Sequence, residues 1–185
     1  MPSDLTLRYL RALADLPHER PRALADLEAC FRAAETPQPL DGPMSGRVLT
    51  TTLGYRLDPI VIGLARLWMP WQGKTFDDGR DEGRNLFSLG ARRLLRVTLP
   101  GYHDVRDEGA RCSAFRFLTS SGPSALSPGV DVLRIDYRSV VENPGWPVRQ
   151  VLDELVAVDD GLYLGQALLH WRGAMRRAAW FSLER

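Results

Sequence analysis

The chain has 185 residues, of which 44% are apolar and 25% are charged, and its formal net charge is +1. This length fits one domain with a short appendage, and the composition excludes a disordered chain. Nucleic-acid-binding domains usually carry a clear basic excess, so the near-neutral charge argues against a nucleic-acid partner.

The expected location of the protein is the cytoplasm. The N-terminus lacks the basic and apolar segments of a signal peptide. The longest apolar stretch, residues 60–69, contains Arg66 and is shorter than the ~20 residues of a membrane helix, so we expect no membrane span. Cys30 and Cys112 lie far apart, with no further thiol or histidine at metal-ligand spacing. We therefore expect two buried or half-buried thiols and no metal site.

Residues 1–36 are predicted to form an appendage of two helices. Leu7, Leu10 and Leu13 recur at helical spacing in the first helix. Prolines then interrupt the pattern, and residues 22–34 place their apolar side chains on one face of a second helix. This pair of helices either packs on the domain that follows or joins two copies of the chain in a homodimer.

A short apolar helix over residues 58–68 is predicted early in the second part of the chain. Prolines within residues 36–43 indicate a linker, and the residues 46–53, rich in Val and Thr, indicate a strand. Asp58 followed by Pro59 suits the start of a helix. Because this helix is apolar on every side, it must be covered on every side, and we expect it to plug one end of a barrel.

From Trp71 onward the sequence predicts strands and turns with no helix between them. Alternating or apolar runs indicate strands over residues 94–99, 112–119, 130–138, 151–158, 162–171 and 178–183, with a turn-rich loop over residues 120–129. Asp159-Asp160-Gly161 between two apolar runs is a strong hairpin signal. Closely spaced strands of this kind are typical of a sandwich or an up-and-down barrel. We predict a mostly β domain over residues 42–185, an antiparallel barrel of about eight strands.

Motifs for catalysis and cofactor binding are largely missing from the sequence. It contains no Gly-x-Ser-x-Gly nucleophile elbow and no glycine loop that would cradle a phosphate. His18, His103 and His170 lie in three different segments, without the spacing of a helical metal site. His103 is the best isolated candidate for acid–base catalysis, although we interpret it as an exposed loop histidine. We therefore expect no cofactor.

The most informative stretch holds Trp68, Trp71, Lys74 and Phe76, and Lys74 is the only lysine of the chain. Tryptophan and lysine together can line a pocket for an anionic or amphipathic ligand, the ring by stacking and the ammonium by pairing. Alternatively, both tryptophans fill the core where the predicted helix meets the barrel.

Polar side chains interrupt the predicted strands. They are Arg134, Asp136, Asp153, Glu154, Gln166 and His170. If the face that carries Gln166 and His170 points into the barrel, these two are buried polar groups that need partners, and if it points outward they are ordinary surface residues. Because both faces of residues 162–171 are largely apolar, alternation alone does not decide between the two.

Six features in chain order together carry a resemblance to a known family. They are Gly42-Pro-Met44-Ser-Gly46, an apolar helix opened by Leu57-Asp58, Trp71-Gln-Gly73-Lys74-Thr-Phe76, the pair Asp136-Tyr137, the hairpin of residues 153–165 and the terminal Trp180-Phe181-Ser182-Leu183-Glu184-Arg185. Their order resembles a bacterial family named for a Gly-x-Trp-x-Gly motif, with the domain of unknown function usually fused to it. Met44 stands where that family has tryptophan. Members of the family look like calycin-type barrels, so the resemblance implies a lipocalin-like barrel over residues 42–185.

The predicted function is the binding of a hydrophobic or amphipathic small molecule inside this barrel. The expected lining residues are Trp68, Trp71, Phe76, Phe115, Phe117, Tyr137 and Trp180, with Lys74 or Arg134 at the polar end. One alternative is a cofactor-free isomerase or cyclase, in which His103, Asp136, Tyr137 or Glu154 supplies acid–base catalysis. Another alternative is an interaction protein with a filled barrel that acts through its N-terminal helices. The same aromatic residues would line a pocket or fill one, so the sequence leaves the interior open.

Overall fold

The computed structural model describes residues 3–52 and 70–185 of the chain. Its helices are α1 (Asp4–Asp15), α2 (Arg20–Ala33) and α4 (Ala91–Thr98), with short 3-10 turns η1 (Asp78–Arg80) and η2 (Val148–Gln150). Its strands are β1 (Gly42–Thr51), β2 (Trp71–Asp77), β3 (Glu82–Ser88), β4 (Arg106–Glu108), β5 (Arg111–Pro123), β6 (Asp131–Asp136), β7 (Val151–Asp159), β8 (Leu162–Trp171) and β9 (Ala174–Glu184). Among these helices, none is both long and apolar enough to cross a membrane.

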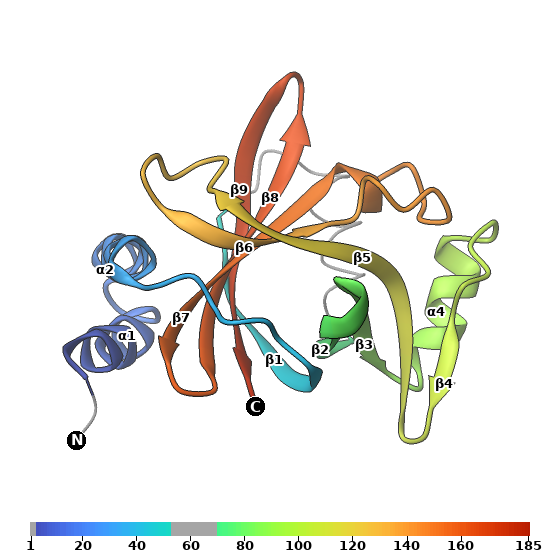
Figure 1. Ribbon diagram of the computed structural model, residues 1–185, viewed down its shortest axis with the longest axis horizontal. Coiled ribbons are helices and arrows are strands. Elements are labelled where there is room, and N and C mark those ends of the chain that lie inside the picture. The colour runs from blue at the N-terminus through green and yellow to red at the C-terminus, as the bar shows by residue number, and fades with distance from the viewer. Residues whose placement is uncertain (1–2, 53–69) are drawn as a thin grey trace.

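Eight of the described strands form a closed antiparallel barrel (Figure 1). The strand order is β3-β2-β1-β9-β8-β7-β6-β5, and β3 pairs back with β5 to close the ring. The long β5 serves two neighbours, because its first half pairs with β3 and its second half with β6. The short β4 pairs only with the start of β5 and extends the sheet beyond the ring. The predicted antiparallel barrel of about eight strands is therefore confirmed.

The last three strands follow the sequence pattern closely. β7, β8 and β9 form two successive antiparallel hairpins. Gly161 has φ 71° in the turn between β7 and β8, and Gly173 has φ 79° in the turn between β8 and β9. Glycine adopts positive φ without the steric penalty of a side chain, so it suits both turns, and the first lies where the Asp-Gly signal predicts it.

Two apolar clusters pack against opposite faces of the barrel wall. The barrel core lies inside the ring and includes Met44, Phe76, Phe117, Ile135, Leu155 and Leu183. The helix–barrel cluster lies outside it and joins Tyr9, Leu27 and Phe31 of the helices to Val132, Leu164 and Trp180 of the strands. Figure 1 shows α1 and α2 side by side against one side of the barrel, with α4 and β4 on the other side. The N-terminal helices thus pack on their own barrel, and a homodimer through them stays a prediction.

The prediction of a strand over residues 94–99 is wrong, because α4 occupies this part of the chain. Ala91 and Leu95, one helical turn apart, are buried, whereas Val97 is 81% exposed. A strand would place Leu95 and Val97 on the same face, but a helix places i and i+4 together. The alternation in Leu-Leu-Arg-Val is short enough to fit either period, so the expectation of no helix among the strands is wrong too.

Smaller differences concern the ends of the predicted segments. β1 begins at Gly42, inside the predicted linker, and β5 continues to Pro123, into the predicted loop. Both cysteines are buried and free, as expected. The predicted plug helix over residues 58–68, including Trp68, lies outside the described residues.

Candidate functional site

A cavity of about 70 Å³ lies inside one end of the barrel. Its walls are largely apolar and come from seven strands and from the segment before β7: Val48, Trp71, Phe87, Phe115, Pro147, Val148, Val151, Ala167, Ala179 and Phe181. Four polar residues also line it, namely Lys74, Asn85, Tyr137 and Asp153, here called the Lys74 cluster. The volume is well below the ~300–1,000 Å³ of pockets for drug-sized ligands, so the space suits only a small molecule.

The opposite end of the barrel is filled by side chains. Phe76 and Phe117 meet edge to face there, with their ring centroids 5.5 Å apart. Met44 and Leu183 are fully buried in the same core. The interior is therefore neither wholly open nor wholly packed, and the Lys74 cluster lies where the filled part meets the cavity.

The Lys74 ammonium is the centre of a buried hydrogen-bond network. Its Nζ donates to Asp153 Oδ2 at 2.8 Å, to Asn85 Oδ1 at 2.9 Å and to the Tyr137 hydroxyl at 2.5 Å. The Tyr137 hydroxyl in turn donates to Asp153 Oδ2 at 3.0 Å. Asn85 Nδ2 donates to the Phe115 carbonyl at 3.2 Å, which ties the network to β5. All three ammonium hydrogens therefore have acceptors, as a buried cation requires.

Aromatic rings enclose the same ammonium. Lys74 Nζ lies 5.2–5.6 Å from the ring centroids of Trp71, Phe117 and Phe181. A cation within about 6 Å of an aromatic face is attracted by the ring quadrupole, and desolvation strengthens that attraction. The ammonium is thus held by one carboxylate and three rings, while Tyr137 meets it through its hydroxyl.

Burial changes the acid–base properties of this cluster. Loss of hydration lowers the pKa of Lys74 below its ordinary value, although the neighbouring Asp153 carboxylate opposes the shift. Burial also raises the pKa of Tyr137 well above its ordinary value, and Asp153 adds to this shift. Tyr137 therefore stays a protonated donor at neutral pH, whereas the Lys74 amine loses its proton more readily than an exposed lysine does.

One acceptor of the Lys74 cluster, Asp153 Oδ1, has no hydrogen-bond donor among the described residues, and Asp153 lines the cavity. Within residues 3–52 and 70–185, Asp153 Oδ2 accepts from Lys74 and Tyr137, while no side chain or backbone group donates to Oδ1. A molecule in the cavity with a hydroxyl or another donor would complete the coordination of this carboxylate.

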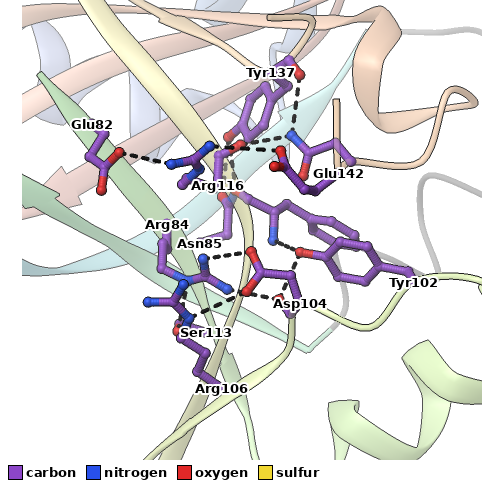
Figure 2. Close-up of polar contacts among 12 residues, drawn as sticks. Glu82, Arg84, Asn85, Tyr102, Asp104, Arg106, Ser113, Arg116, Tyr137 and Glu142 are labelled. Atoms are coloured by element: carbon purple, nitrogen blue, oxygen red, sulfur yellow. Dashed lines mark hydrogen bonds and ion pairs between the residues drawn. The ribbon is translucent and has the colours of Figure 1, made fainter. Parts of the chain in front are cut away.

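Phe115 is held in the cavity wall by Tyr102, which follows α4. The Phe115 backbone has φ 52°, and the register of β5 against β3 shifts here. Its N–H, which the bulge frees from the ladder, donates to the Tyr102 hydroxyl at 2.6 Å. The two rings also stack, with centroids 4.9 Å apart. The Tyr102 hydroxyl also donates to the Asp104 carbonyl at 2.9 Å. The contacts between Tyr102 and Phe115 therefore fix the segment after α4 against β5 (Figure 2).

An arginine–aspartate clamp fixes the same segment from the outer side of the barrel. Figure 2 shows Arg84 reaching from β3 to Asp104 and Ser113. Arg84 Nη1 lies 2.8 Å from Asp104 Oδ2, and Arg84 Nη2 donates to the Asp104 carbonyl at 2.7 Å. The hydrogen bond from Arg84 holds the pKa of Asp104 below its usual value. This clamp supports the wall of the cavity without touching its interior.

The Tyr102 contact predicts a loss of stability at alkaline pH. Burial raises the pKa of Tyr102 from 10.0 to about 12. Between these two pH values the unfolded chain releases the proton and the folded chain keeps it, so the free energy of unfolding falls as the pH rises. Two pKa units correspond to about 3 kcal/mol. In urea titrations between pH 9 and pH 12, Tyr102→Phe should lose less stability than the wild type, and parallel curves would contradict this assignment.

The structure brings together only part of the predicted site. Trp71, Lys74, Phe115 and Tyr137 line the cavity. Phe76 and Phe117 belong to the filled part of the barrel core, although the Phe117 ring contacts Lys74. Arg134 alternates with the inward-facing Leu133 and Ile135 and lies on the outer surface, opposite Glu154 of β7. Trp180 packs outside the barrel against Phe31, with ring centroids 5.5 Å apart. Trp68 lies outside the described residues.

Two residues of the Lys74 cluster, Asn85 and Asp153, were not among the predicted site residues. Asp153 stands out in the sequence as a carboxylate in an apolar strand, but so does its neighbour Glu154. Of the four acid–base candidates, only Tyr137 lines the cavity. His103 is exposed in a loop, and Asp136 accepts hydrogen bonds from the turn after β6. Glu154 accepts hydrogen bonds from Ser124 Oγ and Gln166 Nε2 and does not line the cavity.

Comparisons with known proteins support the fold alone. No protein-family model matches the chain, and no curated protein matches it. A crystal structure of a protein from Thermomonospora curvata is similar, with a TM-score of 0.51 and 16% sequence identity over 96% of this chain and 97% of that one. At this identity the likeness concerns architecture and not activity. The resemblance to the Gly-x-Trp-x-Gly family stays a prediction.

Proposed function

We propose that the barrel binds a small amphipathic molecule in the cavity. The apolar part of the molecule contacts the aromatic wall formed by Trp71, Phe115 and Phe181, and its polar end meets the Lys74 cluster. The single observation that carries this proposal is a buried lysine–aspartate pair facing an apolar cavity. The residue types and the small volume support a small ligand that is apolar apart from one polar end.

A structural role alone does not explain why the charged pair is buried here. Desolvating an ammonium and a carboxylate costs about as much as their attraction returns, and apolar residues of similar volume often replace such pairs without loss of stability. The rest of the barrel core is filled by apolar side chains. A charged pair that lines an apolar cavity is therefore better explained by a ligand that meets it.

The apolar wall can supply most of the affinity. Each 100 Å² of apolar ligand surface removed from water contributes about 2.5 kcal/mol before the costs of association. A small ring with one hydroxyl group fits both parts of the cavity, because the hydroxyl can donate to Asp153 Oδ1. Benzyl alcohol is a suitable probe of this chemistry.

Filling the cavity should abolish this binding. Ala167 lines the cavity, and Ala167→Leu adds three carbon atoms to the space that the probe would occupy. Isothermal titration calorimetry with benzyl alcohol should show an affinity ~10-fold weaker or worse for this variant, a loss of at least about 1.4 kcal/mol. Ala174→Leu makes the same change at an exposed position of β9 and should bind as the wild type does. Equal binding by Ala167→Leu and the wild type, or no binding by any small amphipathic probe, would contradict the proposal.

The isomerase or cyclase alternative has weaker support from the geometry. Of the four predicted acid–base residues, only Tyr137 lines the cavity. Its raised pKa keeps the hydroxyl protonated at neutral pH, so it is a poor proton acceptor. Binding requires only the polarity and shape of the cavity, so it is the function that these residues favour.

A further inference from the structure

We propose that the Lys74 amine captures a small apolar aldehyde or ketone as an imine. This inference rests on the proposed function, because the carbonyl compound must first enter the same cavity. It assigns the ligand class, and it gives Lys74 the role of nucleophile in addition to that of a polar contact.

The ion pair with Asp153 alone does not explain why position 74 carries a lysine. Lysine and arginine together number 24, and Lys74 is the only lysine, so every other cationic side chain is a guanidinium. Arginine forms the better bidentate pair with a carboxylate and tolerates burial at least as well as lysine. An ion pair with Asp153 therefore does not by itself explain an amine. Only an amine can lose its proton near neutral pH and attack a carbonyl carbon.

The surroundings of the Lys74 amine favour its reaction as a nucleophile. Lys74 lines the cavity and is only 2% exposed, so its amine is largely removed from bulk water. Asp153 Oδ2 lies 2.8 Å from Nζ, close enough to accept a proton from the ammonium. Burial lowers the pKa of Lys74 and so favours the neutral form. A desolvated lysine beside an acid–base partner is the arrangement that activates an amine nucleophile.

The residues of the Lys74 cluster can carry the proton transfers of imine formation. Asp153 takes one proton from the ammonium, and the neutral amine attacks the carbonyl carbon, so that a C–N bond forms while the C=O double bond becomes a single bond. The oxygen gains two protons, one from the attacking nitrogen and one from Asp153, and leaves as water. The nitrogen keeps one hydrogen in the resulting iminium, and Asp153 is again a carboxylate that pairs with it. One ammonium and one carbonyl thus give one iminium and one water.

The walls restrict which carbonyl compounds react. The rings of Trp71, Phe115 and Phe181 and the small Ala167 and Ala179 surround the space with apolar surface. An aldehyde with a short or flat apolar body fits this lining, whereas a sugar would leave its hydroxyl groups unpaired. Aromatic faces around the nitrogen also stabilise the positive charge of the iminium.

Reductive trapping tests this chemistry on the intact chain. The protein is incubated with benzaldehyde and sodium cyanoborohydride at pH 7, and the adduct is located by intact mass and peptide mapping. Because Lys74 is the only lysine, the N-terminal α-amino group is the only other amine and serves as an internal reference. We expect one adduct on Lys74, and it should form faster than the adduct on the N-terminal amine. Labelling of the N-terminus alone would overturn the proposal.

Two further measurements separate this inference from the proposed function. Ala167→Leu should label Lys74 more than ~10-fold more slowly, since reaction depends on a positioned carbonyl, while its N-terminal amine should label as in the wild type. Added benzyl alcohol should slow the reaction of benzaldehyde with wild-type Lys74, because both compounds occupy the same cavity. If benzyl alcohol binds and benzaldehyde leaves no adduct on Lys74, the imine is wrong and the binding function stands. If neither compound binds or reacts, both are wrong.

Lys74→Arg provides a chemical control that keeps the positive charge. Its guanidinium can still pair with Asp153 but cannot form an imine under these conditions. The variant should therefore show no internal adduct. If it fails to fold, competition by benzyl alcohol on the wild type still decides the question. An internal adduct in folded Lys74→Arg would overturn the assignment to Lys74.

Discussion

Asp153→Leu should destabilise the protein by about 3–5 kcal/mol, because removing one member of a buried ion pair leaves the other charge without compensation. Lys74 and Asp153 are both buried, with Nζ and Oδ2 2.8 Å apart. The substitution also removes one of the two acceptors near the Tyr137 hydroxyl and leaves Asn85 Oδ1 as the other. Urea unfolding at pH 7, followed by circular dichroism, would measure the change in the free energy of unfolding.

Pairing this substitution with Lys74→Met should restore much of the lost stability. The double variant replaces two charges by apolar side chains of similar size, which is often neutral or stabilising. The two single changes and the double change form a thermodynamic cycle whose coupling energy should exceed about 1 kcal/mol. Asp131→Leu makes the same chemical change at an exposed position on β6 and should alter stability by less than about 0.5 kcal/mol. Additive effects of the two single variants would show that the pair is not coupled.

The pH dependence of Asp153→Leu follows from the same pair. Asp153 opposes the effect of burial on the pKa of Lys74, so its removal should lower that pKa further. The unfolded chain then binds a proton that the folded chain does not, up to the ordinary lysine pKa of 10.5. Stability therefore rises with pH between the lowered pKa of the folded chain and 10.5, and the variant should regain part of its loss between pH 7 and pH 10.5. A deficit that stays constant over this range would contradict the assignment.

The barrel could be predicted because its signals are local. The Asp-Gly turn and the short spacing of the apolar runs identify β7, β8 and β9 without knowledge of their partners. In β6 the alternation is also correct, since Val132 faces the helices while Leu133 and Ile135 face the barrel core. α4 could not be predicted, because its eight residues include three arginines and hold too few apolar positions to separate a helical period from a strand period.

The complete site could not be predicted because strand alternation fails where both faces are buried. α1 and α2 cover the outer face of β7 and β8, so these strands are apolar on both sides. Asp153 and Glu154 then look equivalent in the sequence. In the fold Asp153 meets Lys74, 79 residues away, while Glu154 accepts a hydrogen bond from Gln166 Nε2 at 2.7 Å on the helix side. Only long-range pairing distinguishes a cavity residue from a residue of the helix interface.

Trp180 and Phe181 are neighbours on β9, but Trp180 faces the helices and Phe181 faces the barrel core. Substituting each of them therefore tests this distinction. Trp180→Ala should destabilise the protein by about 3–5 kcal/mol, the usual loss for a fully buried tryptophan. Its ring contacts Phe31 of α2, and the Arg177 guanidinium, which also pairs with Glu28 of α2, lies 4.2 Å from its centroid. The variant should therefore loosen the helices, and limited trypsin digestion should cut faster at the arginines of α1 and α2.

Phe181→Ala is the matched control on the inner face. The Phe181 ring lines the cavity and meets Trp71 edge to face, with centroids 5.7 Å apart. This variant should lose a similar amount of stability, about 3–5 kcal/mol, but keep its helices protected from trypsin. Calorimetry should show altered affinity for benzyl alcohol in Phe181→Ala and near-wild-type affinity in folded Trp180→Ala. If the two variants changed proteolysis and binding alike, the barrel wall would not separate the helix interface from the cavity.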